Sequence, residues 1–147
     1  MGINNGLFTS NKDDYGTPQE LFDELNKKYH FTIDVASNDK NYKCERHYTI
    51  KEDGLKQDWS NEVVWCNPPY GKEIGKWIEK AYKEINAKSV FLVPARTDTR
   101  WFHNYIYKKG NVQIEFLKGR LKFEGGAKQS APFPSMLVFF NFEKEQI

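Results

Sequence analysis

The sequence predicts an α/β fold built on a mixed, mostly parallel sheet. Helical and strand patterns alternate over the first two thirds of the chain, as in βαβ units whose helices cover a parallel sheet. Two apolar runs near the C-terminal end are separated only by a loop, so they can pair antiparallel. The 147 residues, of which 39% are hydrophobic and 29% charged, suit one globular domain rather than a disordered or membrane-spanning chain.

The first helix is predicted to begin at Thr17-Pro18-Gln19-Glu20. Thr17 suits the N-cap position and Pro18 the first helical position, while Glu20 completes a capping box. An apolar face at helical spacing follows, made of Leu21, Phe22, Leu25 and Tyr29.

The other elements are predicted from the same periodicities. Helices are expected where apolar residues recur three and four positions apart, at residues 74–85 and 101–106, with Gly110 as the stop of the second. Strands are expected where apolar residues cluster or alternate, at residues 31–36, 47–50, 63–66, 89–93, 112–116, 121–123 and 136–140. Residues 124–134 are predicted to form a loop, and residues 1–14 a polar arm ahead of a single domain of residues 15–147.

Composition narrows the class of protein further. Two cysteines, Cys44 and Cys66, are too few for a disulfide framework, and no apolar run approaches the roughly 20 residues that span a bilayer. The polar first segment lacks the apolar core of a signal peptide. Cysteine and histidine do not form a four-ligand set, so no metal is expected. We therefore expect a cytoplasmic protein with no membrane partner.

Polar residues follow three of the predicted strands. They occupy residues 34–39, 67–71 and 94–100. In open α/β sheets, ligands bind outside the carboxyl ends of the strands. These three strand ends are therefore the candidates for a common site.

The segment Asn67-Pro68-Pro69-Tyr70 carries the most chemical information. Two prolines directly after an apolar strand end its pairing but leave their carbonyl groups free to accept hydrogen bonds. The Asn67 side chain adds another acceptor, and Tyr70 adds an aromatic face. Several acceptors beside one aromatic plane suit a planar group that bears an amine, such as adenine with its N6 atom.

In five segments, taken in order, the chain resembles the small phage-type DNA N-6-adenine methyltransferase (Dam-like) family. The resemblance spans roughly residues 14–140 and depends on residues 15–18, 33–37, 65–70, 93–99 and 119–123. It implies a Rossmann-like, S-adenosylmethionine-dependent methyltransferase fold. It also implies that the substrate is DNA and that the protein acts inside a host cell, for example in protecting phage DNA from restriction.

The resemblance also implies roles for individual residues. The target base would be held by the catalytic segment Asn67, Pro68, Pro69 and Tyr70. The cofactor would be bound by Thr17, Pro18, Asp34, Ala36, Ser37 and Asp58. Five further residues are candidates to contact DNA phosphates because of their charge and position rather than the resemblance: Arg96, Arg100, Arg120, Lys122 and Lys128. They lie in a region (residues 96–147) with nine Lys and Arg against five Asp and Glu.

One part of the sequence departs from the pattern of the family. Residues 36–39 contain no glycine, and only 32 residues separate Asp34 from Asn67, so the fold is expected to be reduced there. The acid that meets the ribose or adenine of the cofactor can consequently be Glu52, Asp53 or Asp58. Two other functions remain open: a noncatalytic DNA-binding domain, and methylation of a glutamine side-chain amide. Neither an oligomeric state nor a recognition sequence follows from the residues.

Overall fold

The computed structural model describes residues 15–125 and 130–147, and its centre is one five-stranded sheet. The expected polar arm at residues 1–14 lies outside the described residues, as does Lys128. The strand order is β2-β3-β4-β7-β5. The strands are β2 (Ile33–Asp34), β3 (Val63–Cys66), β4 (Lys88–Pro94), β7 (Ser135–Phe140) and β5 (Val112–Phe116).

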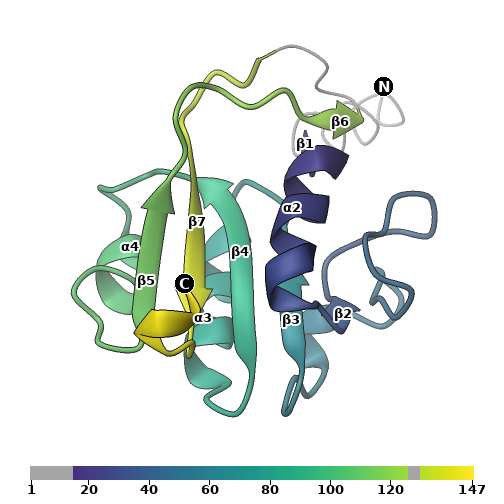
Figure 1. Ribbon diagram of the computed structural model, residues 1–147, viewed down its shortest axis with the longest axis horizontal. Coiled ribbons are helices and arrows are strands. Elements are labelled where there is room, and N and C mark those ends of the chain that lie inside the picture. Colours follow the sequence, from purple (N-terminus) through teal and green to yellow (C-terminus); the bar gives the residue numbers. More distant parts are fainter. Residues whose placement is uncertain (1–14, 126–129) are drawn as a thin grey trace.

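The sheet is mixed, as the sequence predicts. Strands β2, β3 and β4 pair in parallel, whereas β7 pairs antiparallel with both of its neighbours, β4 and β5. Strand β7 therefore runs against the other four. Because β2, β3 and β4 point the same way, Asp34, Asn67 and Pro94 all come at one edge of the sheet (Figure 1).

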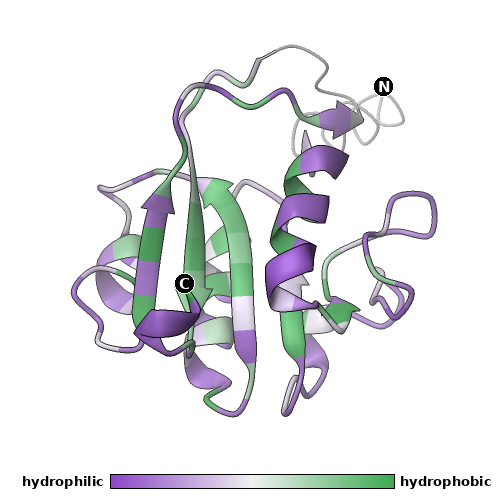
Figure 2. Cartoon of the chain, viewed as in Figure 1, coloured by the Kyte–Doolittle hydropathy of each residue, from purple (hydrophilic) through white to green (hydrophobic). Residues whose placement is uncertain are grey.

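The core is formed where the central strands are covered on both faces. Every residue of β7 is buried, and in Figure 2 β4 and β7 are largely hydrophobic. Helix α2 (Gln19–Tyr29) lies on one face, while α3 (Ile74–Lys83) and α4 (Arg100–Tyr105) lie on the other (Figure 1). On α2, Phe22 packs edge-on against Trp65 with ring centroids 5.5 Å apart, and Tyr29 packs on Phe139 at 5.6 Å. No helix in the described ranges is long and apolar enough to cross a bilayer.

The start of α2 differs from the prediction. Pro18 is the N-cap and makes no side-chain cap, so the capping box expected from Thr17 and Glu20 is wrong. Thr17 is buried, and its hydroxyl instead accepts a hydrogen bond from Asn67. The backbone N–H of Gln19, at the start of the helix, donates to the carboxylate of Glu124, 3.0 Å away. A tertiary contact thus replaces the local cap.

The segment between β2 and β3 is reduced to loops and one short 3-10 turn, η1 (Gly54–Lys56). The expected strand at residues 47–50 is only a single parallel bridge between Asp34 and His47. Around that bridge, the backbone N–H of Asp34 donates to the Arg46 carbonyl at 3.1 Å, and the backbone carbonyl of Asp34 accepts from the Tyr48 N–H at 2.9 Å. The loop therefore wraps the end of β2 by backbone hydrogen bonds.

The chain makes a long excursion between β5 and β7, which we call the 117–134 excursion. The expected strand at residues 121–123 is wrong: Lys122 forms only an isolated bridge with Ser130. Strand β6 (Glu124–Gly125) pairs antiparallel with β1 (Tyr15–Gly16) in a separate two-stranded sheet. This small sheet stands over the N-terminal end of α2, beyond the carboxyl edge of the main sheet (Figure 1).

Helix α4 also ends differently from the prediction. It ends at Tyr105, and the left-handed backbone conformation after it belongs to Lys108 (φ 59°) rather than to Gly110. A short 3-10 turn, η2 (Lys144–Gln146), follows β7 near the end of the chain.

Candidate active site

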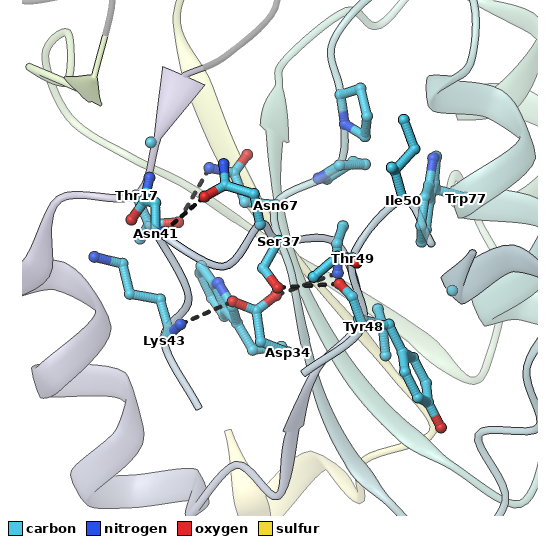
Figure 3. Close-up of a pocket in the computed structure, with 18 of the residues that line it drawn as sticks. Thr17, Asp34, Ser37, Asn41, Lys43, Tyr48, Thr49, Ile50, Asn67 and Trp77 are labelled. Atoms are coloured by element: carbon cyan, nitrogen blue, oxygen red, sulfur yellow. Dashed lines mark hydrogen bonds between the residues drawn. The ribbon is translucent and has the colours of Figure 1, made fainter. Parts of the chain in front are cut away.

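A cavity of about 650 Å³ opens at the carboxyl ends of β2 and β3. Its volume falls within the range of small-molecule and cofactor sites. Figure 3 shows side chains converging on it from β1, from the loop after β2, from the end of β3 and from α3. Seven residues predicted from the sequence line it together: Thr17, Asp34, Ala36, Ser37, Asn67, Pro68 and Pro69.

Asp34 supplies a buried carboxyl group at one end of the cavity. Its side chain accepts hydrogen bonds from the backbone N–H groups of Ala36 at 3.2 Å and Lys43 at 3.0 Å. Burial raises the pKa of Asp34 from 3.8 to about 6, although these two hydrogen bonds and the nearby His47 and Lys43 act in the opposite direction.

No described cation forms an ion pair with Asp34. The ammonium group of Lys43 turns away, to Gln19 at 2.7 Å and to Glu124 at 3.3 Å. The carboxylate is therefore held in place by amides while its charge is left without a paired cation. Such a group is suited to bind a cation that enters the cavity.

Asn67 supplies an oriented amide at the other end. Its Nδ2 donates to the carbonyl oxygen of Tyr15 at 2.5 Å and to the hydroxyl of Thr17 at 3.0 Å. A carbonyl oxygen can only accept, so the nitrogen must face Tyr15 and the amide orientation is determined. The opposite atom, Oδ1, is buried and has no hydrogen-bond partner among the described residues. Buried acceptors are normally hydrogen-bonded, so a bound molecule with a donor group would satisfy Oδ1.

Tyr70 lies behind this end of the cavity. It is 2% exposed and is not one of the residues that line the cavity in the described chain. Its hydroxyl donates to the carbonyl of Leu92 at 2.9 Å, and burial keeps the phenol pKa well above its ordinary value. Its ring is stacked on that of Tyr15, with centroids 5.3 Å apart and an angle of 22° between the planes.

The third part of the cavity contains one candidate from the sequence, Asp53, and its other residues were not proposed for the site. It is formed by residues 48–51, Asp53, Gly54 and Trp77. A Cβ atom on Gly54 would lie 2.2 Å from the carbonyl oxygen of Val35 and 3.1 Å from the Trp77 ring, so only glycine allows this close approach. In the sequence, the Asp53-Gly54 pair indicates a turn, but it does not indicate that Gly54 packs against Val35 and Trp77.

Two of the predicted cofactor residues are not brought to the cavity. Pro18 caps α2 and is not among the lining residues. Asp58 is exposed and accepts hydrogen bonds from the N–H and hydroxyl of Ser60 at 2.9 and 2.7 Å. Of the three acids left open by the sequence, only Asp53 lines the cavity; Glu52 accepts instead from Thr49.

The chain also matches a known protein family over most of its length. The family model for DNA N-6-adenine-methyltransferase (Dam) matches residues 5–147, nearly the whole chain. The chain belongs to the Dam family.

Two curated relatives are similar over parts of the chain. A DNA N-6-adenine-methyltransferase of Escherichia phage T1 is 33% identical over 95 residues, which are 62% of this chain and 40% of the phage protein. A protein of Escherichia coli (strain K12) named "Putative methyltransferase YfdM" is 31% identical over 65 residues, which are 40% of this chain and 71% of that protein. The match to the phage protein therefore spans less than half of that relative.

In this Dam-family chain, the predicted DNA contacts lie on two segments beyond the carboxyl edge of the sheet. Arg96 follows β4 and is half-buried, whereas Arg100 is exposed at the first turn of α4. Arg120 and Lys122 are exposed on the 117–134 excursion, where Arg120 reaches the Ala131 carbonyl at 3.5 Å. Within the described ranges there is no group of three or more residues that could hold a metal ion.

Proposed function

We propose that this Dam-family chain transfers a methyl group from S-adenosylmethionine to the N6 amine of adenine in DNA. One observation carries the proposal: the amide of Asn67, a residue that lines the cavity, is locked with a buried Oδ1 that has no hydrogen-bond partner among the described residues. An exocyclic amine has the N–H donors that this acceptor lacks. The same cavity holds the Asp34 carboxylate, which forms no ion pair with a described side chain and gives the cavity a second and different ligand group.

The residues present fit the proposed cofactor. Asp34 would accept from the α-ammonium group at the methionine end, since it is a buried carboxylate with no ion-pair partner among the described side chains. Asp53, together with the apolar surfaces of Ile50 and Trp77, would meet the adenosine end. When bound, S-adenosylmethionine supplies an already activated methyl group, so the protein needs no strong acid or base.

The chain's own contribution at the reacting amine is electrostatic and geometric. Asn67 Oδ1 and the carbonyl of Pro68 would each accept one N6 hydrogen, which favours a tetrahedral nitrogen and supports the positive charge that develops there. Thr17 and the Tyr15 carbonyl act through Asn67 by fixing its orientation. Alignment of the amine with the methyl group would supply much of the remaining rate enhancement.

We further propose that the adenine is flipped out of the duplex to reach this acceptor, because Asn67 Oδ1 is buried within the protein. Arg96, Arg100, Arg120 and Lys122 would hold the phosphates around it, with Lys128 from outside the described residues as a further candidate. Tyr70 would hold the extruded base by stacking.

Nucleoside mass spectrometry tests this function. Unmethylated bacterial DNA is incubated with the protein and S-adenosylmethionine, digested to nucleosides and analysed. The proposal predicts N6-methyladenine with no change in methylcytosine. Absence of N6-methyladenine from DNA, with S-adenosylmethionine binding intact, would contradict it; methylation of glutamine peptides in a parallel reaction would then favour the amide substrate.

A further inference from the structure

A second feature of the site concerns Tyr15, which lines the cavity and stacks its ring on that of Tyr70. The described lining of the cavity includes Tyr15, Asn67, Pro68 and Pro69, while Tyr70 lies behind them. The Tyr15 ring covers one face of Tyr70 at a centroid distance of 5.3 Å and at 22° to it. This face of Tyr70 therefore meets a residue that lines the cavity.

Two more aromatic rings complete the surroundings of Tyr15. Phe123 and Phe133 meet its ring edge-on, at centroid distances of 5.2 and 5.3 Å and angles of 67° and 81°. The same two rings stand edge-on to Tyr70, at 6.1 and 5.8 Å. Tyr70, Phe123 and Phe133 therefore form an aromatic slot, and the flat ring of Tyr15 fills it.

This slot adjoins the acceptor that the proposed function assigns to the amine. The carbonyl of Tyr15 itself holds Asn67 Nδ2, so the ring of Tyr15 and the Asn67 amide belong to one small cluster. A planar base cannot both bond to Asn67 Oδ1 and stack on Tyr70 while another ring covers Tyr70. The two rings compete for one space.

Resting on the proposed function, we propose that Tyr15 is a placeholder that occupies the target-base slot and leaves it when adenine enters. Only the side chain has to turn, because the Tyr15 carbonyl must stay to orient Asn67. The backbone around it is suited to local adjustment, since β1 is a two-residue strand whose pairing within residues 15–125 and 130–147 is to the two residues of β6. Phe123 and Phe133 come from the 117–134 excursion, which also carries the proposed phosphate contacts Arg120 and Lys122.

The placeholder has a measurable cost for substrate binding. An aromatic pair favours its stacked state by about two- to twelvefold, and an incoming base must overcome that preference. Removing the Tyr15 ring is therefore expected to raise kcat/KM for DNA by about two- to twelvefold. If Tyr15 instead formed a second wall against the bound base, loss of the ring would lower kcat/KM.

Kinetics of Tyr15 variants make this distinction. Tyr15→Ala removes the ring, Tyr15→Leu does so while keeping an apolar side chain on β1, and Tyr15→Phe keeps the ring and controls for the missing hydroxyl. The placeholder predicts that the Ala and Leu variants exceed the Phe variant in kcat/KM for DNA. A tenfold or greater fall in both, at unchanged melting temperature and S-adenosylmethionine affinity, would overturn it.

Fluorine NMR gives a readout that is independent of rate. Protein labelled with 3-fluorotyrosine is mixed with sinefungin and a duplex that it methylates, or with an adenine-free duplex; the Tyr15 signal is assigned from Tyr15→Phe. Only the adenine-containing duplex is expected to shift the Tyr15 signal toward its solvent-exposed position, while the exposed Tyr107 serves as the control. Normal methylation with an unmoved Tyr15 signal overturns the placeholder alone, whereas failure of the wild-type protein to methylate DNA overturns the proposed function and this inference together.

Discussion

The two ends of the cavity are built on opposite principles. At the Asp34 end, a buried carboxylate is satisfied by two backbone amides but has a charge without a cation, and its pKa rises to about 6. At the Asn67 end, a neutral amide is fixed by two acceptors, and its own acceptor atom, Oδ1, has no donor among the described residues. At the Asp34 end, the buried negative charge is unfavourable, and a bound cation would stabilise it. At the Asn67 end, an acceptor is unsatisfied, and a bound amine would donate the hydrogen bond. Under the proposed function, the two ends bind different molecules.

The largest effect is expected at the Asn67 end. Asn67→Ala removes an acceptor that strengthens its interaction as charge develops on the amine, so kcat for methyl transfer should fall by about a hundred- to a thousandfold. Steady-state kinetics on DNA would measure this. Asn104→Ala, at an exposed position of α4, is the matched control and should retain wild-type kcat. A fall of less than about tenfold in Asn67→Ala would remove Asn67 from the reaction.

The next effect concerns the affinity of the Asp34 end for the cofactor as a function of pH. Only the ionised carboxylate attracts the ammonium group, and its pKa is about 6 in the free protein. The affinity for S-adenosylmethionine should therefore fall as pH drops below 6, by up to about tenfold per pH unit. Asp34→Asn should bind more weakly at pH 8, by about 1.5–3 kcal/mol, and without this pH dependence. A pH profile of Asp34→Asn parallel to that of the wild-type protein would contradict this assignment.

The free energy of unfolding should also depend on the ionisation of Asp34, but it should rise rather than fall as the pH drops. The folded pKa of about 6 lies above the ordinary value of 3.8, so between these values the folded state binds the proton more readily than the unfolded state. Lowering the pH from 6 to 4 should thus raise the free energy of unfolding of the wild type relative to Asp34→Asn. The difference should change by up to about 1.4 kcal/mol per pH unit. Urea denaturation of both proteins from pH 4 to 8 measures it; a pH-independent difference would mean that Asp34 is not destabilised by burial.

The smallest effect is expected behind the Asn67 end, at Tyr70. Its hydroxyl binds the Leu92 carbonyl rather than a ligand, so Tyr70→Phe should cost about 1 kcal/mol of stability and leave kcat within a few-fold of the wild type. Thermal denaturation and methyl-transfer kinetics check the two parts separately. A large loss of kcat at unchanged stability would instead assign the hydroxyl a role in the reaction.

The parts of the fold with a clear periodicity could be predicted from the sequence. Strands β3, β4 and β7 and the helices α2 and α3 follow apolar patterns that reflect burial in one core. The three polar strand ends were predictable for the same reason, because strands that run parallel end at one edge. Asp34 and Asn67 accordingly line one cavity.

Contacts between distant segments could not be predicted in this way. Thr17 has the local signature of a helix cap, but its hydroxyl is used by Asn67, 50 positions away in the sequence. Gly54 is required by the carbonyl of Val35, and Tyr15 is placed by Tyr70. Each of these positions depends on a tertiary neighbour, and a single sequence carries no periodic signal for such a pair.

Calorimetric titration of S-adenosylmethionine into Asn67→Ala and Asp34→Asn, in parallel, tests whether the two ends bind different molecules. We expect the affinity of Asn67→Ala for the cofactor to be within about twofold of the wild type. The affinity of Asp34→Asn should be at least about tenfold weaker. Equal loss of affinity in both variants, with both proteins folded, would contradict the division of the cavity into a cofactor end and a base end.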